Sequence, residues 1–291
     1  MCNEDSASLV KSPTTFDEQI DIIKSRGCIV GDESYAKLVF QRINYYRFSA
    51  YFLPFTNNKG SYYKNTTFSK VYRTYEFDGK LRGLLFPIIE EIELYLRTQF
   101  AYFHAHKYGA LGYMEKSHFN NRHNHEKFLE KREDLITKSK SQPFVEHHIF
   151  KYNGDFPIWV IIELFTTNDL SIFYADLKPQ DQKYIAKNCF NTTDSKLVSW
   201  LHCLTILRNY CAHYSRLYYT LFPAQPLTPL GFKYELFKQV FDYILVLKFL
   251  YPIPEQWIKN VKTPLAALIE QYSDCIELKH LGFPKEWASI I

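Results

Sequence analysis

The sequence predicts an all-α fold, and three of its features support that prediction. Glycine supplies only 10 of the 291 residues, fewer than a protein of strands and tight turns usually contains. Apolar residues recur every three or four positions along several long segments, which is the spacing of a helix with one buried face. Hydrophobic residues make up 46% of the chain, so these helices can share a sizeable core.

The N-terminal part is expected to start with disordered chain, residues 1–15, and to continue into two helices. Thr15 and Glu18 have the spacing of a capping box, so a helix should begin after Thr15. Gly27 suits the end of that helix. Helical spacing of apolar residues over 32–55 predicts one second helix.

The longest helix is predicted to open near Asp78 and to close at Gly109, after a turn-rich loop over residues 57–65. Pro87 lies inside this helix. Because proline cannot donate a backbone hydrogen bond, Pro87 should kink the helix or split off its first turn. This helix belongs to an N-terminal helical lobe, residues 16–137.

Residues 138–158 are the best candidate for a linker or long loop between that lobe and a C-terminal one, residues 159–291. IWVIIELF, residues 158–165, spans the start of the second lobe and is compatible with a helix or with a buried strand. A final helical pair is expected over residues 233–280.

Between IWVIIELF and the final helical pair, the sequence of residues 194–222 predicts a second long helix. Asp194 is its candidate N-cap, and the helix should stop before Pro223. Its apolar residues from Leu197 to Cys211 fall within one arc of the helical wheel, which predicts the face that packs into the core.

Charge and cysteine content exclude several classes of protein. The formal net charge of +4 is too small to indicate a nucleic-acid binder by itself, although a local basic patch is compatible with it. The six cysteines are scattered without a CxxC pair, as expected for reduced, mostly buried thiols in a cytoplasmic protein. No segment is long and apolar enough to cross a bilayer, and no common nucleotide-binding or hydrolase signature occurs. We therefore expect a cytoplasmic protein with no membrane association, no metal and no cofactor.

The strongest candidate for a functional site is the segment ILRNYCAHYSRLYYT, residues 206–220. On a helical wheel Asn209 and His213 lie one turn apart, nearly opposite the apolar face, and Arg216 follows one turn later. Arg208 lies at the border, where its stem can cover apolar surface while its guanidinium reaches outward. A solvated helix face would explain any single one of these residues. However, no carboxylate lies three or four positions from either arginine, and unpaired Arg and His suit a phosphate better than a salt-bridge network.

Tyrosines accompany these polar side chains. Tyr210 and Tyr214 lie within the segment, and basic residues among aromatic rings can stack bases and hold phosphates. A second such stretch, INYYRFSAYF, combines Tyr46 with Arg47, although packing into an aromatic core would explain it equally well. With Arg216, these four residues are the candidates for RNA contact.

The string from Arg208 to His213 matches the RNxxxH motif of HEPN-domain ribonucleases, a pattern that is weak alone because it occurs often by chance. The longer string LRNYCAHYSRLYY resembles the abortive-infection family of the AbiD and AbiF type, the Abi-like family. Further segments resemble signatures of that family in the expected order, so that the resemblance spans residues 16–291: FDEQIDIIKSRGCIV, INYYRFSAYFLPF, YEFDGKLRGLLFPIIEEIELYLRTQF, PIWVIIELFTTNDLSIFYADL and LGFPKEWASII. One departure is FTTND, which stands where family members often carry a Ser-Phe-Gly-like turn.

The resemblance implies a HEPN-like helical bundle with additional N-terminal and C-terminal helices. It implies a metal-independent endoribonuclease that acts in phage defence or as a toxin. It also implies association with RNA, both as substrate and as a small non-coding RNA that restrains or guides the protein.

The residue types agree with that chemistry. Metal-free cleavage of RNA needs one group to take the 2′-hydroxyl proton, one to protonate the leaving 5′-oxygen, and fixed positive charge beside the phosphate. His213 can serve in either proton role, Arg208 would hold the phosphate, and Asn209 would orient the imidazole or the ribose. Each chain has one such motif and therefore one motif histidine, whereas the two proton transfers require two proton-transferring groups. We therefore expect a homodimer with a composite site at its twofold interface.

Two other groups of residues are weaker candidates. Arg97 and His104 share a helix face, but Glu93 is placed to pair with Arg97, so a structural salt bridge is expected there. The three histidines of HFNNRHNHEKF, residues 118–128, have no carboxylate or cysteine at ligand spacing. We expect them to lie in a polar loop without a metal.

Two functions therefore remain open. The first is the ribonuclease, and the second is a non-catalytic module that holds a structured RNA through the same Arg, His and Tyr surface. Both predict salt-dependent affinity for RNA, but only the first predicts that His213→Ala abolishes cleavage while much of the binding remains. A weaker third possibility is nucleotide binding or modification at Tyr210 or Tyr214.

Overall fold

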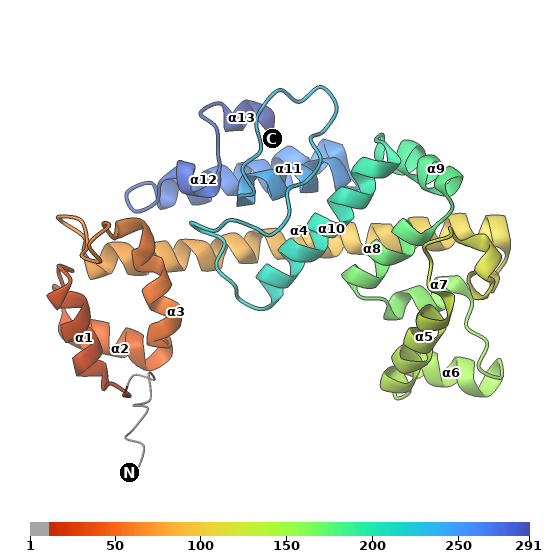
Figure 1. Ribbon diagram of the computed structural model, residues 1–291, viewed down its shortest axis with the longest axis horizontal. Helices are drawn as coiled ribbons and strands as arrows, with labels where there is room; N and C mark the ends of the chain where they lie inside the picture. The colour runs from red at the N-terminus through yellow and green to blue at the C-terminus, as the bar shows by residue number, and fades with distance from the viewer. Residues whose placement is uncertain (1–11) are drawn as a thin grey trace, which may run out of the picture. The chain divides into compact units, whose positions relative to one another are not determined.

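The described part of the chain, residues 12–291, consists of helices joined by turns and loops in the computed structural model (Figure 1). It contains no β-strand, so the all-α prediction is confirmed. Of residues 1–15, for which the sequence predicts disorder, residues 1–11 lie outside the described residues. The α-helices are α1 (Phe16–Ser25), α2 (Glu33–Arg42), α3 (Tyr45–Ser49), α4 (Phe68–Tyr108), α5 (His125–Ser139), α6 (Pro143–Lys151), α7 (Ile158–Ile161), α8 (Thr167–Asp176), α9 (Pro179–Phe190), α10 (Asp194–Ala212), α11 (Val240–Leu250), α12 (Thr263–Gln271) and α13 (Trp287–Ile290).

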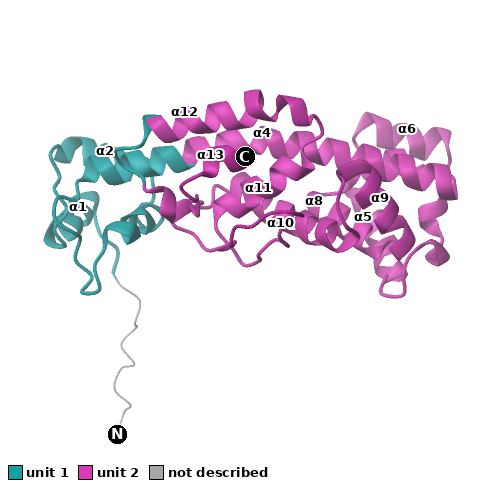
Figure 2. Ribbon diagram, turned by 90° about the horizontal axis from the view of Figure 1, so that it is seen from above, with its two compact units in different colours: residues 1–78, 271–276 teal, residues 79–270, 277–291 magenta. Residues whose placement is uncertain are grey.

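The helices form two compact units (Figure 2). Unit 1 comprises the described residues up to Asp78 together with Gln271–Ile276, and the rest of the described chain forms unit 2. The division falls inside α4 and not within residues 138–158, where the sequence predicts a linker or long loop between two lobes. Much of that segment is helix α6. Pro143 occupies the first position of α6, where its missing N–H would have had no helical partner.

In unit 1 the first helix has the predicted ends. Glu18 donates its N–H to Thr15 Oγ1 at 3.2 Å, and Thr15 donates its N–H to Glu18 Oε2 at 2.6 Å, which completes the capping box. After α1 the chain turns at Gly27, whose φ of +99° lies in the left-handed region that favours glycine. Both end signals of α1 are therefore confirmed.

The prediction of one helix over residues 32–55 is wrong, because the segment contains three helical pieces. After α2 the chain leaves the helix, α3 follows, and a 3-10 helix occupies Ala50–Phe55. Asn44 explains the break: its side chain accepts the N–H of Tyr46 at 2.8 Å and so caps α3. Asparagine competes in this way with helical backbone bonding.

The start of α4 also differs from the prediction near Asp78. The helix begins at Phe68, where Thr67 Oγ1 accepts the N–H of Lys70 at 3.1 Å. Asp78 is buried inside the helix and accepts a hydrogen bond from the Tyr51 hydroxyl at 2.6 Å. This carboxylate therefore stabilises the core of unit 1 and does not cap a helix.

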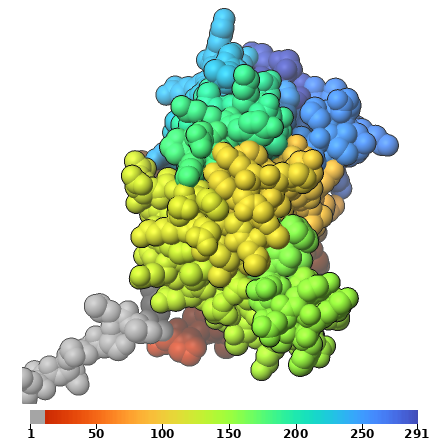
Figure 3. Space-filling model, turned by 90° about the vertical axis from the view of Figure 1, so that its right-hand side faces the viewer, coloured from red at the N-terminus to blue at the C-terminus, as the bar shows by residue number. Residues whose placement is uncertain are grey.

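Of the two predicted effects of Pro87, the split is wrong, because α4 runs unbroken from Phe68 to Tyr108, and the kink stays a prediction. Pro87 and Gly83, the residue whose carbonyl loses its helical partner, are both exposed, so water can bond to that carbonyl. The predicted end at Gly109 is confirmed, and its φ is +83°. Figure 3 looks onto the part of unit 2 that carries the last turns of α4, drawn in yellow.

The core of unit 2 forms around α10, against which α8, α9 and α11 pack. The predicted apolar arc of this helix is buried: Leu197, Trp200, Leu201, Leu204, Leu207 and Cys211. IWVIIELF forms α7 and a 3-10 turn, so its interpretation as a strand is wrong. Four of the five cysteines in the described residues are buried, as expected for core thiols. No helix among residues 12–291 combines the length and apolar character that a membrane span requires.

Candidate functional site

The predicted motif lies at the C-terminal end of α10. The helix begins after Thr193, whose Oγ1 accepts the N–H of Lys196 at 3.4 Å, so Thr193 and not Asp194 is the N-cap. It ends at Ala212, and His213 is the C-cap residue. The predicted continuation of this helix to residue 222 is therefore wrong.

Two backbone hydrogen bonds close this helix end. Tyr214 donates its N–H to the Cys211 carbonyl at 3.3 Å, and Ser215 donates its N–H to the Tyr210 carbonyl at 2.8 Å. Tyr214 itself has a φ of +57°. These are the bonds and the conformation of a Schellman C-cap, in which the left-handed residue is usually glycine. Because a tyrosine occupies this position, no glycine in the sequence marks the end of the helix.

Substitutions of Tyr214 test where the helix ends. At a left-handed position Tyr214→Gly should be more stable than Tyr214→Ala by about 1 kcal/mol, since only alanine has a Cβ that clashes there. In the interior of a longer helix the order would reverse, with alanine favoured by about 1 kcal/mol. Both variants lose the ring, so their difference in unfolding free energy, measured by chemical denaturation, isolates the backbone effect. A more stable alanine variant would contradict the helix end at His213.

The three motif side chains lie where the helical wheel places them. Asn209 and His213 are exposed, and Arg208 is half-buried. None of the three forms a side-chain hydrogen bond or an ion pair with any residue of the described range 12–291. An imidazole, an amide and a guanidinium are thus presented together at one helix end, each with its bonding capacity unused. Their chemical role stays a prediction.

The chain after the motif is irregular as far as Gln239 and is held by side chains of the surrounding helices. Arg82, which is buried, donates from Nη1 to the Ser215 carbonyl at 3.1 Å. Trp200 Nε1 donates to the Leu227 carbonyl at 2.7 Å. At the far end Asp242 Oδ2 accepts two backbone N–H groups, from Phe237 at 2.8 Å and Lys238 at 2.7 Å. Burial raises the pKa of Asp242 to about 6. These bonds fix the backbone that leaves the motif.

The other candidates near the motif are distributed differently from the prediction. Arg216 is not one turn beyond His213 on a shared helix face, because the helix has already ended; it is half-buried in the irregular chain. The ring of Tyr210 packs against Phe222 at 4.7 Å between centroids, which directs one of its faces inward. Tyr214 is 69% exposed and so presents its ring to solvent.

The second predicted stretch for RNA contact lies in unit 1, on α3. Tyr46 is 87% exposed and Arg47 is exposed, whereas Tyr51 of the same stretch is buried. Core packing therefore explains part of the stretch but not Tyr46. Tyr46 borders a groove of about 760 Å³ with Arg26 and Lys59, and no carboxylate lines this groove.

The expected salt bridge of α4 is confirmed. Arg97 Nη2 donates to Glu93 Oε1 at 2.6 Å and to the Phe165 carbonyl at 2.8 Å, which joins α4 to the chain before α8. His104 is fully buried, and neither of its ring nitrogens has a hydrogen-bond partner. Burial lowers the pKa of His104 to about 4. Both residues are thus part of the structure of unit 2 and are not open to a substrate.

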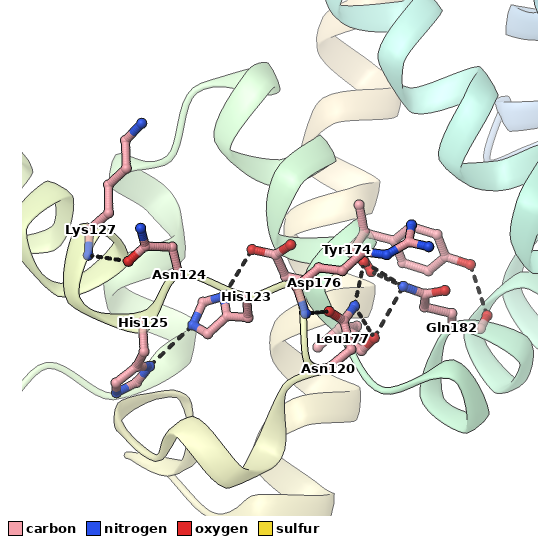
Figure 4. Close-up of polar contacts among 11 residues, drawn as sticks. Asn120, His123, Asn124, His125, Lys127, Tyr174, Asp176, Leu177 and Gln182 are labelled. Atoms are coloured by element: carbon pink, nitrogen blue, oxygen red, sulfur yellow. Dashed lines mark hydrogen bonds and ion pairs between the residues drawn. The ribbon is translucent and has the colours of Figure 1, made fainter.

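Residues 119–124 form the expected loop, but His118 lies in a 3-10 turn before it and His125 begins α5 after it. His123 is buried, and its Nδ1 lies 2.8 Å from Asp176 Oδ2 (Figure 4). Its Nε2 lies 3.1 Å from Nδ1 of His125, whose Nε2 in turn lies 2.9 Å from the Met114 carbonyl. The carboxylate that the local sequence lacks is supplied by Asp176, 53 positions away. No spacing rule within the segment could have identified it.

Comparison with known proteins gives one match. A model of the Abi-like protein family matches residues 39–219, well over half of the chain, from α2 through the motif at the end of α10. No curated protein matches the chain. No solved structure matches it either.

Proposed function

The chain belongs to the Abi-like protein family, which suggests abortive-infection phage defence, and on this basis we propose that it is a metal-independent endoribonuclease of the HEPN type. In this proposal it acts in the cytoplasm as a toxin that cleaves RNA during infection. A small non-coding RNA or another partner would restrain it at other times.

The observation that supports this proposal most strongly is the state of Arg208, Asn209 and His213. They lie together at the end of α10, exposed or half-exposed, and their side chains have no partner among the described residues. A guanidinium with no carboxylate beside it is available for a phosphate. An exposed imidazole is available for proton transfer.

Each residue then has a role in cleavage. Arg208 binds the scissile phosphate and stabilises the charge that builds on it. His213 takes the proton from the 2′-hydroxyl or gives one to the leaving 5′-oxygen. Asn209 orients the imidazole or the ribose. One motif per chain supplies one histidine, so a homodimer that joins two motifs in a composite site would supply both proton transfers.

The alternative is a non-catalytic module that holds a structured RNA. The groove beside Tyr46 supports RNA binding under either function, because it combines an exposed ring with two cations and no carboxylate. Cleavage therefore separates the two functions, and binding alone does not.

The test is incubation of the purified chain with labelled single-stranded RNA in excess EDTA. We expect cleavage under these conditions, since neither proton transfer nor phosphate binding requires a metal in this mechanism. Sedimentation of the same sample should show a dimer. RNA that is bound but never cut would favour the non-catalytic module, and a monomer that cuts RNA would contradict the composite site.

A further inference from the structure

We propose that unit 2 carries a second ligand site, a cavity between α5 and α8 that binds a nucleoside phosphate. The cavity has a volume of about 470 Å³, within the roughly 300–1,000 Å³ typical of small-molecule sites. Its walls come from residues 122–135 and 165–176, so it uses none of the motif residues on α10. It was not evident from the sequence because the two walls are far apart in the chain.

The floor of the cavity is aromatic. Phe165 and Phe173 are 3% and 2% exposed, and Phe128 packs against both at 6.2 and 6.3 Å between ring centroids. Phe128 is only half-buried and lines the cavity, so its ring is the one that keeps surface on which a nucleobase can stack. An aliphatic ligand would not need this geometry.

The rim of the cavity is cationic. Arg122, Lys127 and Lys131 line it and are all exposed. The side chains of Arg122 and Lys127 make no hydrogen bond or ion pair with any other residue in the described part of the chain. Lys131 has only a long contact, 3.9 Å, to Asp169. These charges are therefore available to an anion, as phosphate sites require.

A fourth cation that lines the cavity, Arg132, already bonds to groups of the protein itself. It is 8% exposed, ion-pairs with Glu133, and donates to the Tyr113 hydroxyl at 3.2 Å and the Gly154 carbonyl at 3.3 Å. Arg132 thus holds α5 in place at the cavity wall, and the binding charge comes from the rim.

The two carboxylates of the cavity do not cancel the positive charge of its rim. Asp169 Oδ2 accepts the N–H and the hydroxyl of Thr166, at 3.0 and 2.8 Å, in the capping box of α8. Asp176 Oδ2 lies 2.8 Å from Nδ1 of His123, so this carboxylate is also engaged by a residue of the protein.

The lining therefore carries more positive than negative charge. Three exposed rim cations face two carboxylates, and both carboxylates already accept or share bonds with residues of the protein.

Isothermal titration of the full chain with the four ribonucleoside 5′-monophosphates tests the site. We expect saturable binding of at least one of them, and binding of the matching nucleoside or of inorganic phosphate to be roughly 10- to 100-fold weaker, because each lacks half of the recognised chemistry. The absence of binding at millimolar nucleotide would overturn the proposal, as would equal binding of nucleotide and nucleoside.

Variants locate the binding. The double variant Arg122→Gln with Lys127→Gln should weaken nucleotide binding roughly 10- to 100-fold. Both residues are exposed and without side-chain partners, so the fold should be unaffected. The matched control is Lys138→Gln, an exposed lysine on the same helix that does not line the cavity; its affinity should equal that of the wild type. Equal affinity of the double variant and the wild type would overturn the assignment to this cavity.

The nucleotide could be free or could be the end of an RNA chain. A 2′-O-methyl tetranucleotide, which has no 2′-hydroxyl to attack its phosphates, separates these sources. Tight binding that requires its 5′-phosphate and the rim cations would identify an RNA end, whereas tight binding of mononucleotides only would identify a free nucleotide. Neither titration measures RNA cleavage. A failure to bind nucleotide would therefore not contradict the proposed ribonuclease, and a failure to cleave RNA would not contradict this site.

Discussion

Replacing His213 by alanine is expected to slow RNA cleavage by about 100- to 10,000-fold, the usual contribution of a proton-transferring side chain. The free energy of unfolding should change by no more than about 0.5 kcal/mol, because the side chain is exposed and unbonded among the described residues. The backbone N–H that closes the helix to Asn209 is kept in the variant. Much of the RNA affinity should also remain, since Arg208 is unchanged.

The matched control for this experiment is His202→Ala. His202 is an exposed histidine on the same helix, so the substitution is chemically identical but lies outside the motif. Its cleavage rate should equal that of the wild type when both are measured under single-turnover conditions with the same labelled RNA. If His213→Ala cut as fast as His202→Ala, the proposed site would be wrong.

The second large effect concerns stability in acid and arises at His104. Burial lowers the pKa of its imidazole from 6.5 to about 4. Above pH 6.5 the ring is neutral in both the folded and the unfolded state and contributes no pH dependence. As the pH falls from 6.5 to 4, His104 binds a proton in the unfolded chain but not in the folded protein. The free energy of unfolding therefore decreases. The loss should reach about 3 kcal/mol at pH 4.

Substitution of His104 by leucine should remove that dependence. It also removes two buried nitrogens that have no hydrogen-bond partner, so the variant should be at least as stable as the wild type at pH 4.5. Phe100→Leu is the control, because Phe100 is fully buried on the same helix. It should lower stability by a similar amount at every pH. Urea denaturation of the three proteins between pH 7.5 and 4.5 measures this, and parallel curves for all three would contradict the role of His104.

Features of the fold that depend on a local cap could be predicted from the sequence. Thr15, Glu18 and Gly27 bound α1 as expected, and Gly109 ends α4. These signals work because the side chain or the missing Cβ acts on backbone within four residues. The core face of α10 was likewise predictable, because apolar spacing alone determines it.

Predictions failed where a residue acts against its usual preference or through a distant partner. Asn44 interrupts a segment whose apolar spacing is helical, because its side chain caps the next helix. Tyr214 ends α10 in a conformation that normally requires glycine, so the motif lies at a helix end and Arg216 lies beyond it. The placement of Arg208, Asn209 and His213 survived this error, because all three precede Tyr214.

The nucleoside phosphate cavity illustrates the second kind of failure. Lys127 and Lys131 have the i,i+4 spacing that places them on one face of α5, and this was a usable signal for a basic surface. Phe173 and Asp176 come from α8, about fifty residues later, and only the fold brings them to the same cavity. Local periodicity has no means of pairing such segments.

The measurement that tests the central claim most directly is the chemistry of the RNA ends produced in excess EDTA. If His213 mediates attack by the 2′-hydroxyl, mass spectrometry of a short RNA should show 2′,3′-cyclic phosphate ends with wild-type protein and intact RNA with His213→Ala. Ends with a 3′-hydroxyl and a 5′-phosphate, or identical products from both proteins, would contradict metal-free cleavage at the Arg208–His213 motif.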